Sequence, residues 1–165
     1  MRALRWIGIA LSGLVGAGVL VAIAARLSDG PLGPFPGGRL VAGELVADAH
    51  PDWSFATELS SIELEVDPGE PRSRTTWLAV VDGELYVPCG FPHTKTWPHQ
   101  ALRDGRVVLR IAGRRYERQA VRVSEPALQR RLGAEVARKY GVGDAESAER
   151  GEDVWFFRMD PRPAA

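Results

Sequence analysis

Four residues suited to a phosphorylated, flat ligand flank one predicted β-hairpin. Arg72 and Arg74 stand just before it, and Lys95 and Trp97 follow it. A guanidinium group binds phosphate oxygens in a fork, and a lysine adds a mobile point charge. An indole offers a surface on which a flat ring can stack. Cations and an aromatic plane at the mouth of a small β-structure therefore predict a site for a phosphorylated, planar cofactor.

The hairpin is indicated by two runs rich in β-branched and aromatic residues, Thr75–Val81 and Glu84–Val87. Only Asp82-Gly83 separates them, and this dipeptide readily adopts positive φ at both central positions of a type I′ turn. A Gly/Pro/His loop follows, then a short helix from about Trp97 to Arg103, then a strand from Arg106.

Further strands are expected over Arg39–Val46, over Ser61–Val66, in a second hairpin around Ala112-Gly113, and over Asp153–Met159. The second of these alternates apolar residues with glutamates, which is typical of a strand with one dry and one wet face. Roughly six to seven strands with short helices, in antiparallel order, predict a mainly β domain that forms a small barrel.

One helix is predicted to begin at Ser124, a natural N-cap, and to end at Gly141. Its apolar residues recur every four positions, which predicts one helical face packed on the sheet. The residues of this stripe are Leu128, Leu132, Val136 and Tyr140.

The N-terminal segment, residues 1–27, predicts a single transmembrane helix. Arg2 and Arg5 precede Trp6–Ala25, a run without any charge. As a helix it would span roughly 30 Å, the thickness of the hydrocarbon core of a bilayer. A cleaved signal peptide is the competing interpretation, because Ala22-Ile23-Ala24 fits a small-x-small cleavage site, although the apolar run is longer than usual for one.

The charge bias around this span predicts its orientation. Arg2, Arg5 and the amino terminus outweigh Arg26, so the positive-inside rule places the N-terminus in the cytoplasm and the domain on the extracytoplasmic side of the membrane. We therefore expect a single-pass anchor, a Pro/Gly linker over residues 28–38, a domain over residues 39–161 and a tail over residues 162–165.

The overall composition argues against several classes of function. The 165 residues include 21 basic and 21 acidic side chains, so no net field favours nucleic acid as a partner. A single cysteine excludes an internal disulfide and any multi-cysteine metal cluster. No phosphate-loop, dinucleotide-binding or serine-hydrolase motif is present.

Cys89, His93 and His99 lie within a short span and could in principle ligate zinc or copper. No fourth ligand is evident, and a buried thiol with two polar histidines is the more common arrangement. Cys89 as a nucleophile would need one of these histidines as its base. No metal site is predicted and no catalytic residue is assigned.

Three stretches carry a resemblance to a known family. R-x-R-T-T followed by a strand, Asp82-Gly83 and a strand resembles the R-T-T segment of deazaflavin-dependent nitroreductases. K-x-W-P-H-Q-A-L-R-D-G-R-V is similar to the W-Y-x-N-L-x-x-N-P-x-V segment of that family, and G-R-R-Y-E-x-x-A-V-R-V continues the match. These enzymes belong to the split-barrel class that includes pyridoxamine-phosphate oxidase-like flavin proteins. The resemblance extends over about Ser61 to Pro161.

The resemblance implies a split β-barrel, often dimeric, that binds FMN or a deazaflavin (F420). Arg72, Arg74, Thr75 and Thr76 fall where the family contacts the cofactor phosphate. Lys95, Trp97 and Gln100 fall where it borders the ring or tail of the cofactor.

Two hypotheses follow from these observations. In the first, the chain is a membrane-anchored flavin- or deazaflavin-dependent oxidoreductase, in which the protein positions the ring and the cofactor transfers the hydride. In the second, it is a cofactor-free interaction or structural module of the cell envelope. The second hypothesis expects Arg74 to pair with Glu70 or Asp67, and Trp77 and Phe91 to fill the pocket.

Overall fold

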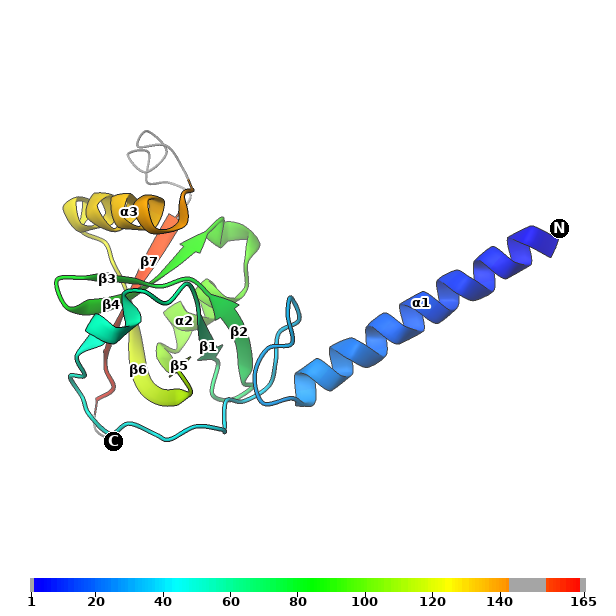
Figure 1. Ribbon diagram of the computed structural model, residues 1–165, viewed down its shortest axis with the longest axis horizontal. Coiled ribbons are helices and arrows are strands. Elements are labelled where there is room, and N and C mark those ends of the chain that lie inside the picture. The colour runs from blue at the N-terminus through cyan, green and yellow to red at the C-terminus, as the bar shows by residue number, and fades with distance from the viewer. Residues whose placement is uncertain (1, 143–153, 164–165) are drawn as a thin grey trace.

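The computed structural model describes residues 2–142 and 154–163, with side chains from Ser12 onward. The described residues form one antiparallel sheet of seven strands in the order β2-β1-β5-β6-β7-β4-β3. The strands are β1 (Ile62–Val66), β2 (Arg72–Thr76), β3 (Ala79–Val81), β4 (Glu84–Gly90), β5 (Arg106–Ile111), β6 (Arg114–Arg122) and β7 (Val154–Pro161). The sheet curls on itself, as Figure 1 shows. The expectation of a mainly β, barrel-like domain is confirmed.

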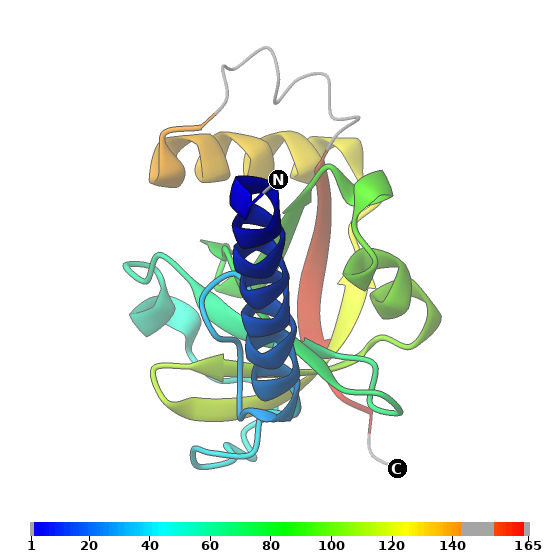
Figure 2. The same cartoon turned by 90° about the vertical axis from the view of Figure 1, so that its right-hand side faces the viewer.

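Three α-helices accompany the sheet: α1 (Arg2–Leu27), α2 (Trp97–Arg103) and α3 (Pro126–Tyr140). Two short 3-10 helices, η1 (Trp53–Ala56) and η2 (Pro92–Thr94), lie in the connections. Helix α3 lies across one end of the curled sheet in Figures 1 and 2. Its residues Leu132 and Val136 are buried against the sheet, which confirms the helical face predicted from the four-residue spacing.

The ends of α3 differ slightly from the expectation. Its cap residue is Glu125, not Ser124, and Pro126 occupies the first helical turn. Gly141 ends the helix with φ 63°, a left-handed conformation that glycine adopts without strain. The last strand begins at Val154, and Asp153 lies outside the described residues.

The tight turn of the first hairpin is confirmed. Asp82 and Gly83 have φ of 54° and 78°, as a type I′ turn requires at its two central positions. Ala112 and Gly113 repeat this pattern, with φ of 49° and 77°, in the hairpin of β5 and β6.

The strand expected over Thr75–Val81 is broken at Trp77-Leu78, and its two halves run to opposite edges of the sheet. Tyr140 explains the break. Its hydroxyl accepts a hydrogen bond from Leu78 N at 3.1 Å and donates one to Leu78 O at 2.9 Å. The ring of Trp77 stacks on Tyr140 with centroids 4.3 Å apart and planes 7° apart. A side chain of α3 thus takes the backbone groups that a continuous strand would use.

The strand expected over Arg39–Val46 is also wrong, because this segment makes only a single parallel bridge, Leu45 to Arg115. Glu44 O and Val46 N bond to the backbone of Arg115 in β6, whereas three earlier backbone donors bond to side chains. Leu40 N donates to Glu65 Oε2 at 2.6 Å. Val41 N and Ala42 N donate to the two carboxylate oxygens of Asp29 at 2.8 and 3.0 Å. The backbone N–H groups of these three residues are therefore satisfied without a sheet ladder.

Helix α1 projects away from the sheet in Figure 1. Apolar side chains along it are exposed, among them Leu14, Leu20 and Leu27. Its last turn contacts the domain, since Arg26 donates to Pro71 O at 2.5 Å and to Glu70 at 3.2 Å. Among the residues whose side chains are described, no helix is long and apolar enough to cross a membrane.

Candidate functional site

One pocket, with a volume of about 250 Å³, lies beside the edge strand β2. Its walls come from three parts of the chain: the end of β2, the segment that follows α1, and the region from β4 to α2. The lining residues are Pro31, Gly33, Pro34, Phe35, Pro36, Arg74, Thr75, Thr76, Pro88, Lys95 and Trp97. Arg74, Thr75, Thr76, Lys95 and Trp97 were predicted as site residues, so the structure brings together five of the seven.

Arg74 supplies the main charge of this pocket. Its Nε is buried and has no hydrogen-bond partner among the described residues. Burial lowers the pKa of its guanidinium, and the nearby Cys89 opposes that effect. A buried donor without a partner costs free energy, so an anionic ligand with oxygen acceptors would stabilise this side chain.

Lys95 adds a second, more exposed cation to the pocket. Within the described part of the chain, neither Lys95 nor Arg74 takes part in an ion pair. Both act on the thiol of Cys89: burial raises the pKa of Cys89, while the charges of Lys95 and Arg74 lower it. The two cations therefore converge on one region next to β4.

Thr75 and Thr76 lie at the end of an edge strand. On one side β2 pairs with β1, where Thr75 faces Glu63 and Thr76 faces Ile62. On its other side, Ser73 pairs with Gly37 through backbone bonds of 2.9 and 3.1 Å. The pocket begins beyond this bridge, and Thr75 and Thr76 line it together with the two cations.

Trp97 is more enclosed than a stacking residue would be. Only 3% of it is exposed, and it packs against Phe157 with ring centroids 5.3 Å apart and planes 49° apart. An indole with an open face would expose far more surface. Trp97 therefore closes the pocket as a wall, and face-to-face stacking on it would require the ring to move.

Arg72 and Gln100 do not line the pocket. Arg72 Nη2 bonds to Glu70 Oε1 at 2.7 Å, and Gln100 Nε2 donates to Asp67 Oδ2 at 3.1 Å. The cofactor-free hypothesis expected Arg74 to pair with Glu70 or Asp67. In the structure these two carboxylates bond to Arg72 and Gln100 instead.

The pocket is also not filled by the aromatic residues of that hypothesis. Trp77 stacks on Tyr140 of α3, and Phe91 is 67% exposed. Neither of them lines the pocket.

The segment Pro31–Pro36 is the part of the site that the sequence analysis missed. Its Pro/Gly composition is typical of a spacer, and it was interpreted as one. In the structure it instead forms a complete side of the pocket. Short-range sequence patterns carry no signal for this, because the contacts that dock the segment join residues far apart in the chain.

Cys89, His93 and His99 do not form a ligand set in the described residues, where no three His, Cys, Asp or Glu side chains are placed to hold a metal ion. Cys89 belongs to the hydrophobic core. The rings of His93 and His99 pack edge-on against Trp155, with centroids 5.4 and 5.3 Å away. Both histidines are thus engaged with an indole.

Comparison with known proteins gives likenesses in structure. No family model matches the chain, and no curated protein matches it either. The conserved hypothetical protein Rv2991 from Mycobacterium tuberculosis is 22% identical with a TM-score of 0.54, over 73% of this chain and 84% of that one. The heme storage protein HutZ from Vibrio cholerae is 15% identical with a TM-score of 0.52, over 67% of this chain and 87% of that one.

At these identities the likenesses establish the fold alone. The architecture agrees with the resemblance noted from the sequence: an antiparallel sheet, curled but open between β2 and β3, with α3 at its end. This chain therefore shares the fold of these two proteins, an antiparallel sheet curled into an open, split β-barrel.

Proposed function

We propose that the pocket binds the phosphate of a flavin or deazaflavin, FMN or F420, and that the protein is an oxidoreductase dependent on that cofactor. The observation that carries this proposal is Arg74, a half-buried cation whose Nε is buried and has no partner among the described residues, beside Lys95 in a pocket. Phosphate oxygens would satisfy the orphaned Nε of Arg74, so the residues present fit the group.

The volume of the pocket limits which part of the cofactor it encloses. About 250 Å³ is smaller than the roughly 300–1,000 Å³ of pockets that enclose a drug-sized ligand. We expect the phosphate-bearing end to lie inside the pocket, between Arg74 and Lys95, with the hydroxyls of Thr75 and Thr76 as further donors. The flavin or deazaflavin would supply the hydride chemistry. The contribution of Arg72 and Gln100 stays a prediction.

Titration of the full-length chain, purified in detergent, tests the proposal. FMN, F420, inorganic phosphate and haem are compared, with haem included because HutZ is described as a heme storage protein. We expect micromolar binding of FMN or F420. Each charge-assisted contact contributes about 1.5–3 kcal/mol, so Arg74→Ala should weaken binding by about ten- to a hundredfold.

Arg130→Ala is the matched control, since Arg130 is an exposed residue of α3 and does not line the pocket. It should leave the affinity unchanged. Affinities no tighter than millimolar for every flavin and deazaflavin would refute the proposal and favour the cofactor-free envelope module.

We also propose that α1 tethers the domain to a membrane as a single-pass anchor, with the domain on the extracytoplasmic side. The uncharged run Trp6–Ala25 and the exposed apolar side chains of α1 support this. A reporter fused after Ala165 that is active only in the cytoplasm would refute the orientation, and a mature chain beginning near Arg26 would indicate a signal peptide instead. We further propose that the domain forms a homodimer, as the resemblance implies, and native mass spectrometry of the same preparation tests this.

A further inference from the structure

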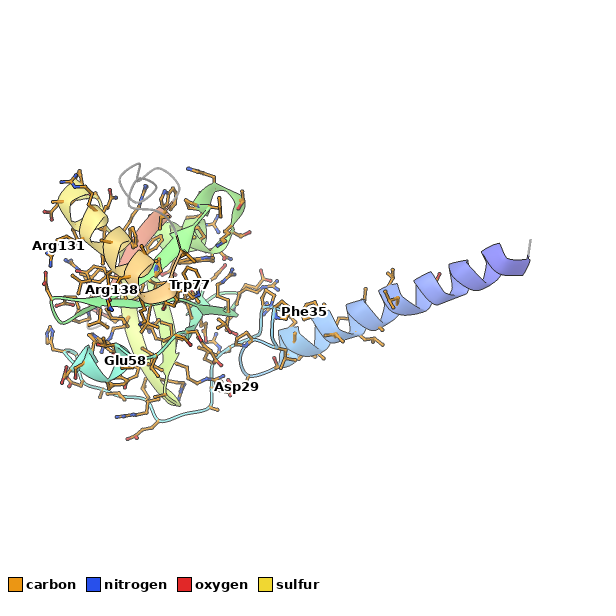
Figure 3. The ribbon with its side chains drawn as sticks, turned by 45° about the horizontal axis from the view of Figure 1, so that its top comes forward. Asp29, Phe35, Glu58, Trp77, Arg131 and Arg138 are labelled. Carbon is orange, nitrogen blue, oxygen red and sulfur yellow. The ribbon has the colours of Figure 1, made fainter. Side chains whose placement is uncertain are left out.

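The segment Ser28–Gly38, which we call the wall segment, is attached to the sheet chiefly through polar contacts. Most of the pocket-lining stretch within it is exposed, including Phe35, so little apolar burial holds it in place. Figure 3 shows Asp29 and Phe35 at the junction between α1 and the domain. Contacts at the two ends of the wall segment must therefore determine where this side of the pocket lies.

At its start, the wall segment is held by an ion-pair network on the surface of the sheet. Arg110 Nη1 lies 3.0 Å from both carboxylate oxygens of Asp29, and Arg110 Nη2 donates to Asp29 O at 3.0 Å. Glu63 fixes the same guanidinium from the other side, through Arg110 Nε at 2.6 Å. The side chain of Arg110 is only 15% exposed and that of Asp29 29%, so this ion pair is better shielded from solvent than a fully exposed surface pair.

At its other end, the wall segment is held by the backbone bridge of Gly37 to Ser73. The approach is close enough to require glycine, since a Cβ on Gly37 would collide with Gly30 O and would lie 2.6 Å from Ser73 Oγ. Ser73 directly precedes Arg74. The bridge therefore ties the wall segment to the strand that carries the main cation of the pocket.

We propose that Asp29 and Arg110 are positioning residues of the pocket, which act through the wall segment by holding Pro31–Pro36 against the cations of β2. This inference rests on the proposed function for the nature of the ligand. The cations bind the phosphate, while the wall segment encloses the part of the ligand that is attached to the phosphate. Loss of the ion pair should therefore affect a large phosphorylated ligand and spare inorganic phosphate.

Asp29→Asn in the full-length chain tests the proposal, because it removes the charge and keeps an oxygen that can accept from Val41 N or Ala42 N. Hydrogen exchange is measured at the amides of Leu32, Phe35 and Gly37, which are bonded within the segment and to Ser73. We expect exchange at these amides to accelerate about tenfold. The affinity for FMN or F420 should fall about three- to tenfold, and the affinity for inorganic phosphate should change less than twofold.

Asp82→Asn is the matched control, because Asp82 forms an exposed ion pair with Arg131 at 2.8 Å in the turn between β3 and β4. Asparagine also tolerates the positive φ of that position. This variant should leave both exchange and affinity as in the wild type. Gly37→Ala should displace the other end of the segment, whereas Gly69→Ala, where a Cβ meets only Asp67 Oδ1 at 3.6 Å, should not.

Two results would overturn the inference: wild-type exchange rates at these amides in Asp29→Asn, or a parallel loss of affinity for phosphate and cofactor. Absence of cofactor binding by the wild type would instead refute the proposed function. The exchange rates are measured without ligand, so they test the anchoring of the wall segment independently.

Discussion

Replacing Arg74 with methionine should separate the stability of the domain from its capacity to bind anions. Methionine matches the length of the arginine stem but carries no charge and no donors. In the native protein, Arg74 Nε is buried and without a partner among the described residues, and burial lowers the pKa of the guanidinium. Both facts indicate that the ligand-free protein holds this cation at a cost.

The size of the effect follows from the unpaired donor. Leaving a buried polar group without a partner costs about 1–3 kcal/mol, and the lower limit applies here because Arg74 is half-buried. Arg74→Met should therefore raise the free energy of unfolding by about 1 kcal/mol, which corresponds to a rise in Tm of about 3–5 °C. The same change should weaken FMN or F420 binding by about 10- to 150-fold, the equivalent of about 1.5–3 kcal/mol.

The assay combines thermal unfolding of the full-length chain without ligand and titration with the cofactor. Arg131→Met is the control, since Arg131 pairs with Asp82 at 2.8 Å on the surface, where ion pairs contribute about 0–1 kcal/mol, and it does not line the pocket. A loss of stability above about 1 kcal/mol in Arg74→Met, with unchanged binding, would show that Arg74 is a structural residue. The reasoning about the pocket would then be wrong.

Three further predictions concern the fold. Leu132→Ala should lower the free energy of unfolding by about 2–5 kcal/mol in urea, because Leu132 is fully buried under α3; a loss below about 0.5 kcal/mol would contradict its place in the core. Tyr140→Phe should lower the free energy of unfolding by about 1–3 kcal/mol, because it leaves Leu78 N and Leu78 O without their partner. Tyr86→Phe is its control, since it also removes a tyrosine hydroxyl. Burial raises the pKa of Glu65 above 4.5, so its protonated form is favoured in the folded state and its contribution to stability is lost as the pH rises from 4.5 through the raised value. Glu65→Gln should therefore gain stability relative to the wild type across that range in urea unfolding, and a difference independent of pH would refute the assignment.

Local patterns predicted most of the elements of the domain. The type I′ turn at Asp82-Gly83 follows from backbone preferences of two adjacent residues, and the buried face of α3 follows from a four-residue period. The helix Trp97–Arg103 appears with the bounds expected for it. Each of these features depends on residues close together in the chain, so the sequence could indicate it.

The site was predictable only in part, for a related reason. Arg74, Thr75 and Thr76 are neighbours on one strand end, so the sequence places them together. Lys95 follows the hairpin of β3 and β4 at the other edge of the sheet, so its approach to Arg74 depends on the curling of the sheet. Arg72 points to Glu70 and Gln100 to Asp67, so neither side chain reaches the pocket. Each side chain had several polar partners within reach in the sequence. The sequence alone does not indicate which of these partners a side chain will bind.

What the sequence by itself determined is most of the strands, turns and helix faces, and the neighbouring site residues Arg74, Thr75 and Thr76 of β2. Tertiary structure alone decided the break at Trp77-Leu78, the absence of a strand over Arg39–Val46, and the use of Pro31–Pro36 as a wall of the pocket. In all three, backbone groups are bonded or positioned by side chains distant in sequence: Tyr140, Asp29 with Glu65, and Arg110. Strand propensity describes the conformation that a segment prefers by itself. It does not decide the structure when a side chain distant in sequence satisfies the same backbone donors and acceptors.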